Sequence, residues 1–216
     1  MKSKVLLLTI LVSIFPQANA LVDLRVGYGL NNGNPSQFNS AMDSLNPGYP
    51  AAKSMTGFNL DAILSLPLVP FGFGIRYESL SASANQNFAA SSAALASKFT
   101  FDRLALLVNY HIIDTLVYFG PLATYGITNT SKLNIDCDLC SPATHIASQA
   151  SSVTTYSVGV EGGLKLLLLR VGAELGYASF TGKDYAYNGA NFSSAGSNVK
   201  IEMNGLYAKV LLGIGI

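Results

Sequence analysis

The chain has 216 residues, of which half are hydrophobic and only 12% are charged, and its formal net charge at pH 7 is +1. That length suits one domain and is short for two. The near-neutral balance excludes the basic surface of a nucleic-acid-binding protein, and a soluble domain would carry about a quarter charged residues.

Residues 1–20 have the three parts of a secretory signal peptide. A positive start is followed by an apolar run from Val5 to Phe15 and by the small-x-small cleavage pattern Ala18-Asn19-Ala20. Because the apolar run is shorter than the ~20 residues that a spanning helix needs, an uncleaved anchor is the less favoured alternative. We expect the mature protein to begin at Leu21 and residues 21–216 to form one domain.

The mature chain contains eight segments in which apolar residues occupy every second position, as in a strand with one apolar face. The third segment is representative, because Phe71, Phe73, Ile75 and Tyr77 alternate with small or charged residues. The eight predicted strands cover residues 22–30, 58–66, 71–78, 103–112, 117–127, 156–165, 171–177 and 206–216. This pattern predicts an all-β protein.

Long and short connections alternate strictly between these strands. Three are tight turns, at residues 67–70, 113–115 and 166–169, and four are long segments rich in Asn, Ser, Ala and Gly, at about 31–54, 81–97, 129–152 and 180–198. Outer-membrane barrels have short periplasmic turns and long extracellular loops, whereas a secreted β-sandwich, the alternative fold, mixes the two. The strand lengths also match the ~9–11 residues that cross a bilayer. The sequence therefore predicts an eight-stranded antiparallel up-and-down transmembrane β-barrel in the bacterial outer membrane, with four long extracellular loops and three short periplasmic turns.

Aromatic residues on the apolar faces gather at one height. Counted from the periplasmic end of each strand, six of them lie about six to nine residues up, where a membrane barrel carries an interfacial girdle. This predicted girdle consists of Tyr28, Phe58, Tyr77, Tyr125, Tyr156 and Tyr177.

Charged residues occur on the opposite, inward faces of the strands. An isolated buried charge is very costly, so we expect these side chains to pair with one another. An eight-stranded barrel has an interior just wide enough for side chains to fill it. The predicted result is a structural plug of ion pairs and hydrogen bonds formed by Arg25, Asp61, Arg76, Glu78, Glu161, Glu174 and Lys209.

The two cysteines, Cys137 and Cys140, lie in the third long loop. An exported chain meets an oxidising compartment, so a disulfide in this loop is favoured over the zinc or redox roles that a CxxC spacing also allows. No cluster of His or Cys predicts a metal site, and we expect no cofactor.

Candidate catalytic residues are few. Of the two histidines, His111 is expected to face the barrel interior, and His145 lies in the cysteine loop with Ser148 three residues further on. A Ser/His pair with a carboxylate can form a nucleophilic site, but Glu161 is expected to lie too deep in the barrel to orient His145. We therefore expect no enzyme activity, and a lipid A-modifying esterase is the least favoured function.

The signal peptide, the eight alternating strands and the charged interior resemble the small outer-membrane barrels typified by the OmpA transmembrane domain and the OmpW and Opa-like proteins. The resemblance is architectural, covers nearly the whole mature chain and rests on no family motif. The chain departs from it at its last residues, Gly213-Ile214-Gly215-Ile216, where such barrels commonly end in an aromatic residue.

The resemblance implies a structural or surface-interaction role carried by the long loops, since loops on a rigid scaffold commonly carry function. The alternative is a narrow channel or a lateral route for small or apolar solutes, and the inward positions Asn59, Leu122, Thr124 and Ser157 are mixed in polarity. The implied partners are outer-membrane lipid and lipopolysaccharide, the barrel-assembly machinery during biogenesis, and an extracellular ligand bound by the loops, with no nucleic acid.

Overall fold

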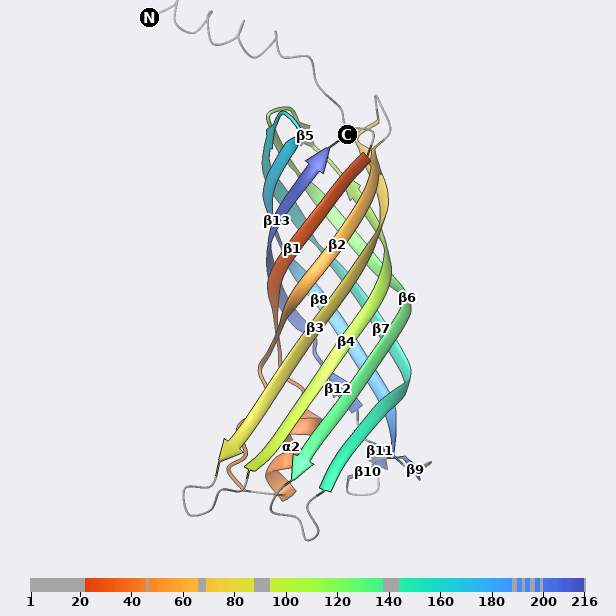
Figure 1. The fold of residues 1–216 in the computed structure, drawn as a ribbon. Coiled ribbons are helices and arrows are strands. Elements are labelled where there is room, and N and C mark those ends of the chain that lie inside the picture. The colour runs from red at the N-terminus through yellow and green to blue at the C-terminus, as the bar shows by residue number, and fades with distance from the viewer. Residues whose placement is uncertain are drawn as a thin grey trace, which may run out of the picture.

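Strands with alternating side chains build a closed sheet in the computed structural model, which describes residues 22–45, 47–65, 69–87, 94–137, 144–187, 190–191, 193–194, 197–198 and 200–215. The predicted signal peptide and Cys140 lie outside these residues. Eight long strands run antiparallel: β1 (Val22–Gly33), β2 (Ser54–Ser65), β3 (Phe71–Asn87), β4 (Ala94–Tyr110), β6 (Val117–Cys137), β7 (Thr144–Leu166), β8 (Leu169–Tyr187) and β13 (Gly205–Gly215). Each pairs with two neighbours, and β13 pairs with both β8 and β1, so the sheet closes into a barrel (Figure 1). The predicted eight-stranded architecture is confirmed.

The barrel is strongly staggered. From Asp23 on β1, we step to the directly opposite residue on each neighbouring strand in turn, through β2, β3, β4, β6, β7, β8 and β13. The last step returns to β1 at Gly33, ten residues beyond Asp23. An eight-stranded sheet with this stagger closes with its strands tilted by about 40°. Each residue then adds about 2.5 Å of height along the barrel axis, and each step to the next strand in the order β1 to β13 adds about 3 Å. These two increments give the height of any strand residue along the barrel axis, which we call its level.

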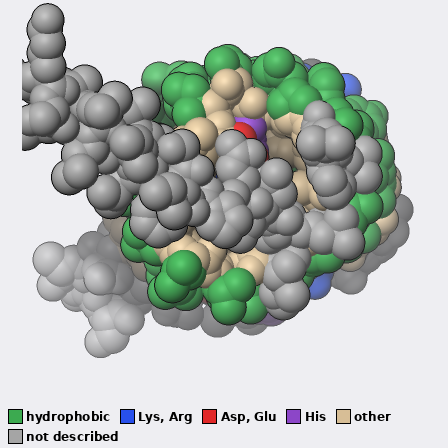
Figure 2. Space-filling view, turned by 90° about the horizontal axis from the view of Figure 1, so that it is seen from above, with side chains coloured by type: hydrophobic (Ala, Val, Ile, Leu, Met, Phe, Trp, Pro, Cys, Tyr) green, Lys and Arg blue, Asp and Glu red, His purple; other side chains and the backbone are tan. Residues whose placement is uncertain are grey.

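The outer surface near the chain ends is apolar. In an outer-membrane barrel both chain ends lie on the periplasmic side, and viewed from that side hydrophobic side chains ring the barrel (Figure 2). The six residues of the predicted girdle all face outward, with exposed fractions between 41% and 59%. By the register they lie within about 6 Å of one level. The apolar band below this level faces the lipid.

Five strands continue far beyond the girdle, which corrects the predicted loop boundaries. β3 and β4 extend through most of the predicted loop 81–97, β6 and β7 through most of 129–152, and β8 into 180–198. The cause is an inversion of polarity along each strand. In β4, Leu106 and Val108 face outward below the girdle, whereas Phe99 and Phe101 face inward above it. Polar residues cover the outside of the extension, so its sequence resembles that of a loop.

The first predicted loop contains a helix that was not predicted, α2 (Ser36–Leu45). Phe38, Ala41 and Met42 are buried on one face of α2, at the i, i+3, i+4 spacing of a short amphipathic helix. Short strands complete the fold: β5 (Ile113–Asp114), β9 (Ala190–Asn191), β10 (Ser193–Ser194), β11 (Ser197–Asn198) and β12 (Lys200–Glu202). No helix among the described residues is long and apolar enough to cross a membrane.

The periplasmic turns are tied to one another by backbone hydrogen bonds. The Lys165 amide donates to the Leu116 carbonyl, and the Gly215 amide donates to the Leu168 carbonyl, each at 2.8 Å. Leu167, in the turn between β7 and β8, has a φ of 57°, which is the left-handed region. The ends of the hairpins are therefore joined into one periplasmic rim.

Candidate functional site

The interior of the membrane-spanning half is filled by charged side chains, and all seven residues of the predicted charge set are buried there. The Arg25 guanidinium donates to Glu161 at 2.6 Å and lies 3.6 Å from Asp61. Arg76 donates to both Asp61 oxygens, at 2.8 and 2.7 Å, and to Glu174 at 2.9 Å. The register places Glu161 directly opposite Glu174, so the two arginines neutralise a pair of like charges.

A second group of charges lies nearer the girdle. Glu78 accepts a hydrogen bond of 2.7 Å from Arg103 and also binds the Lys209 ammonium. Arg103 was not in the predicted set, although its inward position on the fourth strand was recognisable from the alternation. With Arg103 included, this network matches four cations with four carboxylates, namely Arg25, Arg76, Arg103 and Lys209 with Asp61, Glu78, Glu161 and Glu174. A further buried pair that was not predicted, Arg170 with Asp23 at 2.5 Å, lies near the periplasmic end. The interior charge is therefore balanced.

The periplasmic end of the lumen is narrowed by His111 and Tyr118. The His111 ring lies 2.9 Å from Glu161 and 5.4 Å, centroid to centroid, from the Tyr118 ring. Tyr118 is buried over the cross-strand glycine pair Gly163 and Gly172, where added Cβ atoms would meet its hydroxyl. His111 therefore faces the interior, and glycine provides the space that the tyrosine ring occupies.

Replacing Gly172 by Val is expected to destabilise the barrel by about 1–3 kcal/mol, because the new side chain overlaps Tyr118 and overpacking a filled interior is costly. The measurement is the midpoint of urea unfolding in lipid vesicles. Ala173→Val is the matched control, since Ala173 is the adjacent residue of β8 and is exposed on the outer face. Equal midpoints for the two variants would show that Tyr118 moves aside at no cost.

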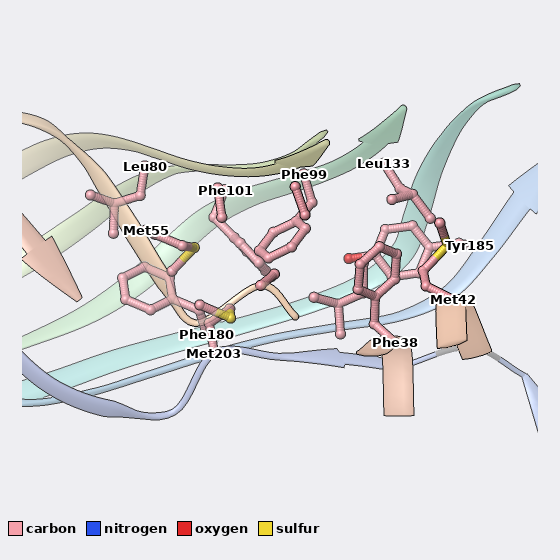
Figure 3. Packing of buried hydrophobic residues seen from close by; sticks show 14 of the residues in the cluster. Phe38, Met42, Met55, Leu80, Phe99, Phe101, Leu133, Phe180, Tyr185 and Met203 are labelled. Carbon is pink, nitrogen blue, oxygen red and sulfur yellow. The ribbon is translucent and has the colours of Figure 1, made fainter. Parts of the chain in front are cut away.

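The extracellular half of the lumen is apolar. A continuous core of buried residues occupies it, and Figure 3 shows aromatic and methionine side chains from opposite walls meeting there. Its members include Phe38, Met42, Met55, Leu80, Phe99, Phe101, Leu133, Phe180, Tyr185 and Met203. The mixed upper lumen predicted from Asn59, Leu122, Thr124 and Ser157 concerns positions nearer the girdle, and this core was not predicted.

Helix α2 enters the mouth of the barrel and completes the apolar core. Phe38 packs edge to face against Phe99, with ring centroids 5.6 Å apart. The Asn39 side chain pairs with the backbone of Ala52 through two hydrogen bonds of 3.0 Å. The Tyr49 hydroxyl donates to the Ala84 carbonyl at 2.5 Å, and burial raises the pKa of Tyr49. The first loop is thus held inside the barrel by packing and by hydrogen bonds.

Two polar side chains lie at the floor of the apolar core. Asn31 and Tyr207 are cross-strand partners, 1% and 3% exposed. The side-chain amide of Asn31 and the hydroxyl of Tyr207 have no hydrogen-bond partner among the described residues. Buried polar groups are nearly always hydrogen-bonded, so this pair is a place where a polar atom of another molecule would be stabilised.

The residues considered for catalysis are not brought together. His145 pairs with Asp136 on the exposed rim of the extracellular half, whereas Ser148 is buried on the opposite face and donates to the Ala186 carbonyl at 2.8 Å. Glu161 binds His111 instead. Among the described residues no group of three or more His, Cys, Asp or Glu side chains is arranged to hold a metal ion. The disulfide of Cys137 with Cys140 stays a prediction, because Cys140 is not described.

Comparisons with known proteins concern the fold. No family model and no curated protein matches the chain. The outer-membrane protease OmpT from Escherichia coli matches with a TM-score of 0.48 at 12% identity, covering 94% of this chain and 98% of OmpT. Ail, the attachment invasion locus protein of Yersinia pestis solved with the heparin analogue sucrose octasulfate, matches with a TM-score of 0.46 at 11% identity, covering 90% and 96%. Neisserial surface protein A matches with a TM-score of 0.40 at 12% identity, covering 90% and 97%.

A sheet can span a bilayer only if it closes, so that no strand edge is left unpaired in the hydrocarbon. This barrel is closed, and its outer face carries an apolar band and an aromatic girdle, as in membrane-spanning barrels. The protein is a β-barrel of the bacterial outer membrane.

Proposed function

We propose that this protein is a sealed outer-membrane barrel that acts without catalysis, by presenting its rigid extracellular half for recognition. The observation that carries the proposal is the filling of the lumen, by paired charges in the membrane-spanning half and by an apolar core above it. Because side chains fill the lumen, other molecules contact the protein at its outer surface.

The shape of the extracellular half supports this role. β3 runs from Tyr77 in the girdle to Asn87, a rise of about 25 Å at ~2.5 Å per residue. Its outward residues there are polar, among them Ser83 and Asn85. A sheet held from inside by an apolar core presents these groups in fixed positions, which lowers the entropic cost of recognition.

Planar-bilayer conductance tests the seal. We expect the purified barrel to give no stepwise conductance at voltages at which a porin, reconstituted in the same way, conducts. Regular steps of defined size from the wild-type protein would overturn the sealed-barrel proposal and favour the narrow channel.

Adhesion by whole cells tests the surface role. A variant in which residues 132–149 are replaced by a tight turn removes the upper part of the β6–β7 hairpin and leaves the membrane-spanning strands. Cells that display this variant are expected to lose the attachment or aggregation that wild-type cells show, at equal amounts of heat-modifiable protein in the outer membrane. Wild-type cells that behave like cells carrying an empty vector would contradict the proposal.

Binding of an apolar molecule is the second candidate function, favoured by the apolar core with Asn31 and Tyr207 at its floor. Ligand pockets are mostly apolar with a few polar groups that orient the ligand. If α2 moves out of the mouth, the core becomes such a site. A fluorescent long-chain fatty acid is the probe: saturable binding that weakens in Asn31→Leu would support this candidate, and absence of saturable binding would remove it.

A further inference from the structure

The outward-facing lysines of the extracellular half lie at one level. By the increments given above, they lie within about 6 Å of one height, about 15 Å beyond the aromatic girdle. We call these residues the lysine belt: Lys53, Lys98, Lys132, Lys183 and Lys200. The other described lysines, Lys165 and Lys209, are bound to Asp114 and Glu78. The belt therefore collects the exposed lysines of the described barrel.

The charges of the belt are largely uncompensated. Among the described residues, Lys200 alone in the belt has a carboxylate within ion-pair distance, Glu202 at 2.5 Å. Asp102 accepts a hydrogen bond from Ser79 and Asp184 accepts one from Asn198, and these two carboxylates with Glu202 are fewer than the five lysines of the belt. The belt therefore carries a local excess of positive charge, although the chain as a whole is nearly neutral.

The register places belt lysines next to one another. Lys183 lies directly opposite Lys200, an arrangement that is unfavourable for like charges unless an anion lies between them. Lys98 faces Asn134 and Lys132 faces Thr100, so these two lysines are diagonal neighbours about 7–8 Å apart. Each pair is spaced so that its two ammonium groups can bind one phosphate group from two sides, and the Asn134 amide and the Thr100 hydroxyl lie beside the pair of Lys98 and Lys132.

We infer that the lysine belt binds the phosphorylated inner-core sugars of lipopolysaccharide, the glycolipid of the outer leaflet. The level of the belt carries this assignment, because a girdle marks the edge of the hydrocarbon and the layer about 15 Å above it is the saccharide layer. Lysine clusters beside a membrane bind anionic lipid headgroups by charge attraction. The inference rests on the proposed surface role and names a partner for it.

The test compares Lys98→Gln/Lys132→Gln/Lys183→Gln with the charge-conserving Lys98→Arg/Lys132→Arg/Lys183→Arg and the wild type. Fluorescent lipopolysaccharide with a phosphorylated core is titrated onto the detergent-solubilised barrels, and lipopolysaccharide truncated to lipid A serves as the reference probe. We expect the Gln variant to bind the phosphorylated-core form at least about tenfold more weakly, the Arg variant to bind like the wild type, and all three to bind lipid A equally.

Three results would overturn the inference. Equal affinity of the Gln variant and the wild type for the phosphorylated core would remove the belt as a site. An equal loss on lipid A would place the contact at the membrane surface. Tighter binding of soluble heparin than of lipopolysaccharide would assign the belt to a free polyanion. Heat-modifiability on an SDS gel verifies that each variant is folded, and bilayer conductance, which tests the seal, is unaffected by these outcomes.

Discussion

Replacing Arg76 by Met is expected to destabilise the barrel by about 3–5 kcal/mol, because removing one partner of a buried ion pair leaves an uncompensated charge. Arg76 is 0% exposed and holds Asp61 and Glu174 on opposite walls of the lumen. Both carboxylates would lose their principal cation while their side chains stay buried. The measurement is the free energy of unfolding in urea, in vesicles of fixed lipid composition.

Two variants separate charge imbalance from lost packing. Arg76→Met/Glu174→Gln removes one of the stranded charges and is expected to recover at least about 1 kcal/mol relative to Arg76→Met. Lys200→Met breaks the more exposed pair with Glu202 and is expected to cost less than about 1 kcal/mol. If Arg76→Met were as mild as Lys200→Met, the interior charges would have to be hydrated and the plug would not be sealed.

Phe99→Ala is expected to cost about 3–5 kcal/mol, the usual range for deleting a buried aromatic side chain. Phe99 is 1% exposed and supports Phe38, through which α2 is held in the mouth of the barrel. We expect the loss to be concentrated in the extracellular half, because the strands below the girdle keep their lipid contacts. Limited proteolysis on intact cells is then expected to cut the first loop of this variant and to leave the first loop of the wild type intact.

Phe58→Ala is the control for that experiment, because Phe58 is a girdle residue that is 44% exposed on the outer face and lies far from α2. This variant should leave the first loop resistant to protease. Resistance of the first loop in Phe99→Ala as well would mean that the hydrogen bonds of Asn39 and Tyr49 hold α2 without the aromatic contact.

The membrane-spanning half of the fold was predictable from the sequence because one rule governs it. Apolar residues face the lipid and polar ones face the lumen, so the alternation in β3 from Phe71 to Tyr77 located the strand, its outer face and the inward Arg76. Which charge binds which was not predictable. Arg103 meets Glu78 and Arg76 meets Glu174 through a stagger and a diameter that single strands do not encode.

The extracellular half was not predictable by the same rule because the rule inverts there. Ser79, Ser81 and Ser83 face water while Leu80 and Ala82 face the core, and a Ser/Ala sequence of this kind has little contrast between its faces. Helix α2 was missed for a related reason, since its apolar face is short. A search for alternation of either polarity along each strand would have found the extensions.

The ion pairs that cross the lumen have a consequence for how the barrel assembles. Arg25–Glu161 joins β1 to β7, Arg76–Glu174 joins β3 to β8, and Lys209–Glu78 joins β13 to β3, and none of these strand pairs are neighbours in the sheet. An open sheet in the bilayer would expose all of these charges to lipid. Neighbouring strands already pair Arg76 with Asp61 and Arg103 with Glu78. The three pairs that cross the lumen form only when β13 closes onto β1, so closure of that last seam and completion of the plug are a single cooperative event.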